Sequence, residues 1–258
     1  MLPPADGFAI YRLVPPYELR QELSAEKLAA SRLPHGALLV LRIADPIQAV
    51  DSACQLIPAL RRRFPHVPVA LQLTSLSPET LLLAERGIQL RARALFTTEA
   101  QPYPDLRFPF THLLDPADEV LEWLTLRRVH VPASLTCVLQ RIFRTAGDFA
   151  TVGDLLDAAG EAESTMRASF RRAALPAPRE WFRLSRALQA ALQIQGHPER
   201  SLSCIAHDLR YSDQTSLIRQ IRHCFGLRPD AIRGTLGWEW LLDRWVTRVA
   251  ERPADPVA

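Results

Sequence analysis

The sequence lacks the features that mark membrane and secreted proteins. None of its 258 residues belongs to a run of about 20 apolar residues, the length that spans a bilayer. The N-terminus, MLPPADGFAIYRL, has no basic segment followed by an apolar one. The four cysteines are far apart and form no Cys-x-x-Cys pair, so a disulfide framework has no support in a chain of this length. We therefore expect a cytoplasmic protein with reduced thiols and no membrane partner.

The motifs of common enzyme classes are also missing. The sequence contains no Gly-rich phosphate loop, no Gly-x-Ser-x-Gly, no His-Glu-x-x-His and no Cys–His pair in a catalytic frame. Cys204, His207, His223 and Cys224 suggest zinc, but the adjacent His223 and Cys224 point in different directions on a helix. We expect no catalytic activity, no cofactor and no metal.

Lysine is nearly absent, since Lys27 is the only one and the other cations are arginines. The chain has 13 basic and 14 acidic residues before Arg128, but 18 basic and 14 acidic residues from Arg128 on. A planar guanidinium can bind phosphate or guanine through two hydrogen bonds. The arginine bias favours a polyanionic partner for the second half of the chain, and the base composition of the genome is the alternative explanation.

Short β-like runs alternate with longer helical ones up to about residue 128. Such alternation is typical of a parallel sheet flanked by helices, so we predict an α/β domain over residues 1–128. The expected strands are 8–14, 36–43, 67–74 and 93–98, and the expected helices are 16–33, 46–64 and 77–92.

From residue 131 onward the β-like runs disappear, which predicts an all-α domain over residues 129–258. The tryptophans at helical spacing near its end, Trp238, Trp240 and Trp245, are expected in the core, with a surface for a second subunit or a polymerase as the alternative. The expected helices are 132–146, 151–159, 163–174, 178–195, 202–209, 213–225 and 229–251.

The second half contains an internal repeat whose two copies start about fifty residues apart. The segments 151–183 and 201–233 each begin with a plausible N-cap, Thr151 or Ser201, and each places polar turn residues before a second helix. Each copy is therefore predicted to be a helix-turn-helix, a unit whose second helix reads bases in the major groove of DNA.

The predicted second helix of each copy has a polar face suited to reading bases. Glutamine can pair with adenine, arginine with guanine, and the threonine methyl can contact thymine. The alternative for Arg219 is an ion pair with Asp213 or with a carboxylate of the linking helix. The candidate DNA-binding residues are Ser164, Thr165, Arg167 and Arg171 in the first copy, and Gln214, Thr215, Ser216, Arg219 and Arg222 in the second.

Residues 131–235 resemble the AraC/XylS family of bacterial transcription regulators. The resemblance rests on Ile205-Ala206, Tyr211 after the turn, Leu217, Arg222 and the run FGLRP that ends at Pro229. It implies a DNA-binding domain of two helix-turn-helix units joined by a long helix over residues 178–196. Three positions depart from the family pattern: Arg210 replaces the usual Gly, Ile221 the usual Phe, and Glu161 an apolar turn residue.

Residues 36–87 are similar to the middle of a response-regulator receiver domain, with Thr74 at the position of its strand-end hydroxyl. The phosphorylation chemistry is missing. Arg42 lies nearest the acceptor position, the first strand ends without an acidic pair, no lysine follows Thr97, and Asp45 is the one substitute acceptor. We expect a degenerate, receiver-like domain that regulates or dimerises without phosphate.

These patterns favour a sequence-specific transcription regulator of bacterial type, with double-stranded DNA as its partner. RNA polymerase and a second copy of the chain are further candidate partners. Two alternatives remain. One is a protein–protein adaptor whose helix-turn-helix units no longer contact DNA, and the other is a regulator that senses a ligand at the strand ends of its α/β domain.

Overall fold

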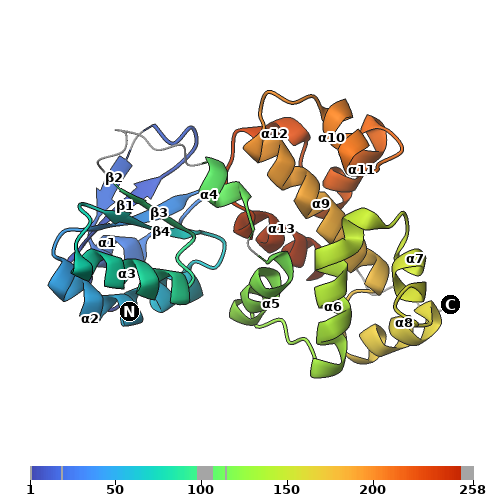
Figure 1. Cartoon of the computed structure of the whole chain (residues 1–258), viewed down its shortest axis with the longest axis horizontal. Helices are drawn as coiled ribbons and strands as arrows, with labels where there is room; N and C mark the ends of the chain where they lie inside the picture. The colour runs from blue at the N-terminus through green and yellow to red at the C-terminus, as the bar shows by residue number, and fades with distance from the viewer. Residues whose placement is uncertain (1, 19, 98–106, 114, 251–258) are drawn as a thin grey trace. The chain divides into compact units, whose positions relative to one another are not determined.

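The computed structural model describes residues 2–18, 20–97, 107–113 and 115–250, and its contacts divide the chain into two compact units (Figure 1). The first unit comprises Met1–His112 and Gly234–Trp240, and the second comprises Leu113–Arg233 and Leu241–Ala258. This division differs from the predicted boundary between residues 128 and 129. The helix α5 (Pro116–Leu126) falls in the second unit because it packs against α6 (Ala133–Thr145).

The first unit contains a five-stranded mixed sheet in the order β2-β1-β3-β4-β5. The strands β3, β4 and β5 are parallel to one another, whereas β1 runs antiparallel to both β2 and β3. All four expected strands are present. The prediction of a parallel sheet is wrong for β1, which runs antiparallel to its neighbours. The bounds are β1 (Phe8–Leu13), β2 (Arg20–Leu23), β3 (Leu38–Ile43), β4 (Val69–Leu73) and β5 (Ala94–Thr97).

The prediction of one helix over residues 16–33 is wrong. Its first half forms β2, which pairs with β1 so that Leu23 lies opposite Ile10, and only α1 (Ala25–Ala30) is helical. The hydroxyl of Ser24 starts α1 by accepting a hydrogen bond from the Lys27 amide at 3.2 Å. Pairing with a neighbouring strand thus overrides the helical propensity of the residues in β2.

The two faces of the sheet are covered differently. The helices α2 (Pro46–Arg63) and α3 (Pro78–Gln89) pack with α1 against one face, in a core that includes Leu41, Leu71 and Ile57 (Figure 1). On the other face, Val40 and Ala70 pack with Phe110 of α4 (Arg107–Thr111) and with Leu236, which comes from the far end of the chain. The segment 234–240 is therefore part of the first unit's core.

The carboxylate of Asp45 has a structural role at the start of α2. It accepts hydrogen bonds from the amides of Ile47 at 3.0 Å and Gln48 at 3.3 Å, and from the Gln48 side chain at 2.9 Å. Arg42 lies over the ring of Tyr11, 5.5 Å from its centroid.

In the described part of the chain, no three His, Cys, Asp or Glu side chains are placed to hold a metal ion, and no helix is long and apolar enough to cross a membrane.

The second unit is helical, and six of the seven predicted helices are confirmed. The seventh, over residues 229–251, is wrong because residues 234–238 separate two helices there, and Gly237 in this stretch has φ +84°. The bounds are α6 (Ala133–Thr145), α7 (Val152–Asp157), α8 (Glu163–Arg172), α9 (Pro178–Gly196), α10 (Leu202–Asp208), α11 (Gln214–Phe225), α12 (Pro229–Arg233) and α13 (Glu239–Ala250), with a short 3₁₀ turn at Ala146–Asp148.

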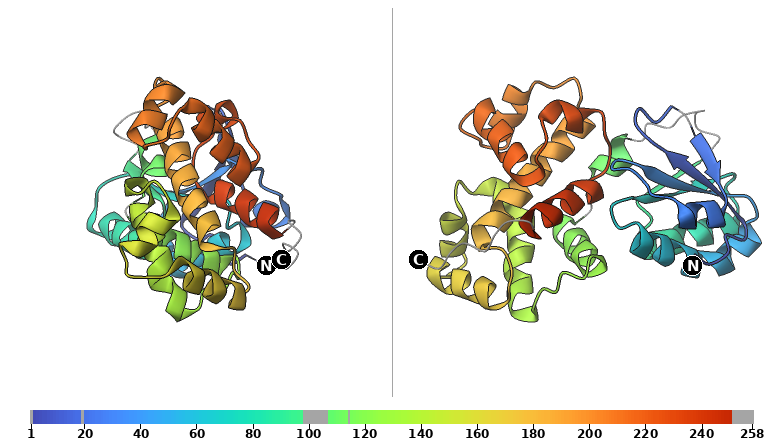
Figure 2. Two further views of the ribbon diagram at one scale, coloured as in Figure 1. Left: turned by 90° about the vertical axis from the view of Figure 1, so that its right-hand side faces the viewer. Right: turned by 180° about the vertical axis from the view of Figure 1, so that it is seen from behind.

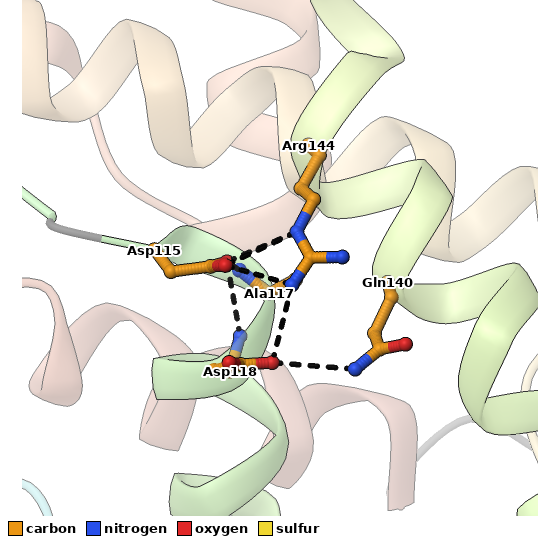
Figure 3. Close-up of polar contacts among 5 residues, drawn as sticks. All are labelled: Asp115, Ala117, Asp118, Gln140 and Arg144. Atoms are coloured by element: carbon orange, nitrogen blue, oxygen red, sulfur yellow. Dashed lines mark hydrogen bonds and ion pairs between the residues drawn. The ribbon is translucent and has the colours of Figure 1, made fainter.

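Side-chain contacts join the helices of the second unit. Arg144 of α6 donates to the carboxylate of Asp115, the N-cap of α5, from Nε at 3.1 Å and from Nη2 at 2.7 Å (Figure 3). In the core, the rings of Trp181 and Trp245 lie 4.7 Å apart. Trp238, Trp240 and Trp245 are all less than 5% exposed, so the prediction that these tryptophans are core residues is confirmed.

Candidate nucleic-acid interface

Two pairs of short helices, α7 with α8 and α10 with α11, form the predicted helix-turn-helix units, and α9 joins them (Figure 2). The Thr151 hydroxyl accepts from the Asp154 amide at 3.1 Å, while the Asp154 carboxylate accepts from the Thr151 amide at 3.0 Å. The Ser201 hydroxyl accepts from the Cys204 amide at 3.2 Å. Both predicted N-caps are therefore confirmed, and each fixes the first residue of its unit.

The helix α11 has a buried face and a solvent face, as its periodicity predicts. Leu217, Ile221 and Phe225 are fully buried, with Ile221 filling the place of the family's usual Phe. Of the predicted reading residues, Gln214, at the first position of α11, and Thr215, Arg219 and Arg222 are exposed, and Ser216 is half-buried. The elements that bury one face of α11 thus leave these side chains directed outward.

No carboxylate among the described residues pairs with Arg219. In the described part of the chain, neither its guanidinium nor that of Arg222 makes a hydrogen bond or an ion pair. Asp213, the partner considered for Arg219, instead caps α11 by accepting from the Ser216 amide at 2.7 Å. This hydrogen bond holds the pKa of Asp213 below its usual range, so the carboxylate remains an ionised cap at neutral pH.

The helix α8 offers a smaller set of available side chains. Ser164, Thr165, Arg167 and Arg171 are exposed, whereas Phe170 on the same helix is buried. Arg167 is not free, however, because its Nη2 contacts the Glu163 carboxylate at 2.8 Å, one helical turn earlier. An exposed pair of this kind contributes little to stability and can exchange for a phosphate.

Sequence reasoning missed the basic start of α9. A groove in the second unit is lined by Thr151, Glu163, Arg179, Arg183 and Gln220, among other residues, so it joins α7, α8, α9 and α11. Arg179 is exposed. Arg183 contacts Glu180 at 2.8 Å, and its carbonyl accepts from the Gln220 side chain at 2.8 Å. Arg179, Arg183 and Arg186 are four and three residues apart, so the sequence alone places them on one side of a helix and could have predicted this basic surface.

The two turns have the left-handed residue that the unit requires. Gly160 in the first turn has φ +72°, and Arg210 in the second has φ +55°. A residue with a side chain is strained in this region, so Arg210 departs from the family pattern at a backbone cost. Glu161 follows Gly160 and is half-buried.

Residues 155–235 match a protein family described as a helix-turn-helix domain. The match supports an AraC-family-like DNA-binding domain in this part of the chain. The match starts inside α7 and ends just after α12, so the matched region contains α8, α11 and the whole of α9. The match supports a DNA-binding transcription regulator. No curated protein matches the chain.

Proposed function

We propose that the protein is a sequence-specific transcription regulator that reads DNA with both helix-turn-helix units in successive major-groove segments. The observation that carries this proposal is the solvent face of α11, where Arg219 is exposed and has no partner among the described residues, with Gln214 and Thr215 exposed in the first turn of the same helix. These side chains have the donors and acceptors that base edges require.

Phosphate contacts are assigned to the cations at the edges of this surface. Arg222 lies in the last turn of α11, Arg171 in the last turn of α8, and Arg179 in the first turn of α9, and all three are exposed. Such contacts set the register of a protein on DNA without reading the sequence. They also make binding dependent on salt, because each neutralised phosphate releases a counterion.

For the first unit we propose a regulatory or dimerising role without phosphate or catalytic chemistry. Four large apolar side chains of this unit are strongly exposed within thirteen residues: Leu76 at 67%, Leu81 at 57%, Leu82 at 51% and Ile88 at 57%. Exposed apolar side chains gathered in this way are typical of surfaces that bind another protein. A second copy of the chain and RNA polymerase are the partners to test.

The test is binding of the full chain to duplexes selected from a random library, measured across a salt series. We expect the logarithm of the association constant to fall linearly with the logarithm of the salt concentration, with a slope of about −0.9 per phosphate contacted. The matched comparison is the Arg219→Ala, Arg222→Ala double variant, which should bind more weakly and lose discrimination at the base pair that Arg219 reads. Failure of the full chain to bind any duplex at low salt would favour the adaptor alternative.

A further inference from the structure

Arg186 lies in the middle of α9 and is only 7% exposed. Its guanidinium reaches both helix-turn-helix units. Nη2 donates to the carbonyls of Leu209 at 2.9 Å and Arg210 at 3.0 Å, and Nη1 donates to the carbonyl of Ala150 at 3.4 Å. The first two carbonyls follow the last residue of α10, and Ala150 directly precedes the N-cap of α7. One buried side chain thus bonds to the turn of the second unit and to the entry of the first.

Aromatic rings hold this guanidinium in place. Its central carbon lies 4.4 Å from the centroid of the Tyr211 ring and 5.8 Å from that of Phe182. Burial raises the pKa of the Tyr211 hydroxyl well above its usual range, so this ring is neutral at physiological pH. Backbone carbonyls at a helix end and the face of an aromatic ring both favour a cation, so Arg186 is well matched to this position.

Arg210 adds a second side-chain contact between the second helix-turn-helix unit and the entry of the first. Its carbonyl accepts from Arg186, while its own Nη1 donates to the carbonyl of Asp148 at 3.2 Å, 62 residues away in the sequence. The residue that departs from the family's glycine therefore has a role that glycine cannot perform. Its side chain bonds the second turn to the segment that leads into α7.

We propose that Arg186 and Arg210 form a clasp that fixes the angle and separation of α8 and α11, and thereby determines which spacing of two DNA half-sites the protein accepts. Both are positioning residues, since they act through the backbone of the two units. The part of the proposal that concerns DNA rests on the proposed function. The part that concerns helix positions does not.

The guanidinium makes this clasp rigid. Its donors lie in one plane at fixed directions, so three carbonyls from two units can be bonded by Arg186 only when the units keep one relative orientation. A lysine could keep the charge but has a flexible stem and a single donor group. The clasp therefore constrains orientation in addition to adding stability.

The first experiment measures helix positions without DNA. Spin labels are placed at Thr165→Cys and Thr215→Cys on the solvent faces of α8 and α11, in a full chain whose exposed cysteines, Cys54, Cys137 and Cys204, are changed to Ser. Electron–electron distance measurement should give a narrow distribution for the parent. The distribution should broaden at least about twofold in Arg186→Met and in Arg210→Gly.

The two Arg210 variants separate strain from bonding. Arg210→Gly removes the left-handed strain together with the side chain, whereas Arg210→Ala removes the side chain alone. Both should broaden the distribution equally, and the matched control Arg200→Ala, an arginine of the same domain outside the clasp, should leave it narrow. If Arg186→Met does not fold, the Arg210 variants carry the test. Distributions as narrow as the parent's in Arg210→Gly and Arg210→Ala would overturn the proposal.

The second experiment measures spacing preference on selected duplexes with one or two base pairs inserted between the half-sites. One inserted base pair turns the second half-site by about a tenth of a helical turn. The parent should lose about tenfold or more in affinity per inserted pair, and Arg210→Gly less than about threefold, with equal affinity of both for a single half-site. An unchanged spacing preference in a variant with a broadened distribution would overturn the DNA part. If the parent binds no duplex, the proposed function fails, and the distance result still decides the clasp.

Discussion

Arg219 and Arg222 lie three residues apart on the solvent face of α11, and the proposed function gives them different roles because they lie at different positions along the helix. Arg219 follows Gln214 and Thr215 within the first two turns, the part of a recognition helix that reaches base edges. Arg222 lies in the last turn, and we propose that it contacts the phosphate backbone there. The proposal therefore assigns base reading to Arg219 and phosphate binding to Arg222.

Replacing each arginine should separate these roles. Arg219→Ala should weaken binding to the preferred duplex by about 1–3 kcal/mol and relax discrimination at one base pair. Arg222→Ala should weaken all duplexes alike and reduce the salt slope by about one phosphate contact. Both are measured on a panel of single-base variants of the selected site. If Arg219→Ala leaves affinity and base preference unchanged, α11 does not read DNA with this face.

At the residue scale, helical periodicity predicted which side chains of α11 are buried and which are exposed. It could not predict hydrogen bonds to backbone carbonyls far along the chain. Arg186 and Arg210 both donate hydrogen bonds to backbone carbonyls of other elements. Every residue has such a carbonyl, so the sequence does not show which one a side chain bonds. The ion pair of Arg167 with Glu163 could have been predicted from the sequence, because the two residues are four positions apart on a helix.

At the scale of elements, the two errors have different causes. Residues 20–23 have helix-forming side chains but become a strand because β1 offers an unpaired edge. Residues 234–238 interrupt a helical pattern at two glycines, and Leu236 there packs into the core of the first unit. Strong local signals gave correct elements elsewhere, as at α3, where Ser77 and Thr80 form a capping box.

The start of α5 provides a prediction at this scale. The Arg144 guanidinium beside Asp115, together with the amides of Asp118 and Ala117, holds the pKa of this carboxyl below its usual range. A depressed pKa contributes stability that is present above the unfolded-state value, near 4, and is lost as the pH falls through the lower folded-state value. Asp115→Asn should therefore lower the melting temperature at pH 7 and have much less effect near pH 2.

The measurement is thermal unfolding of the full chain and the variant across this pH range. Asp118→Asn is the matched control, because Asp118 contacts the same Arg144 at the longer distance of 3.4 Å and does not cap the helix. It should lower the melting temperature less. An equal loss at pH 7 and pH 2 in Asp115→Asn would show that the ion pair does not stabilise α5.

At the scale of the whole molecule, the chain contributes to the first unit twice, with Met1–His112 and with Gly234–Trp240. Alternation of strands and helices predicted an α/β domain from the first stretch, but local periodicity cannot show that a segment more than a hundred residues later completes it. The segment enters the core through Leu236 and is held by Tyr17. The Tyr17 hydroxyl donates to the Gly36 carbonyl at 2.8 Å and accepts from the Leu236 amide at 2.8 Å.

Removing this hydroxyl should weaken the fold of the first unit. Tyr17→Phe leaves a carbonyl and an amide without their partner, which costs about 1–3 kcal/mol in the free energy of unfolding. Burial raises the pKa of Tyr17 to about 12, so its contribution is fully present below pH 10 and is lost as the pH rises from 10 to 12. In urea unfolding, the parent should lose stability over that interval more steeply than Tyr17→Phe. The matched control is Tyr11→Phe in β1, which should change stability little. If it costs as much as Tyr17→Phe, the segment 234–240 is not held in place by the Tyr17 hydroxyl.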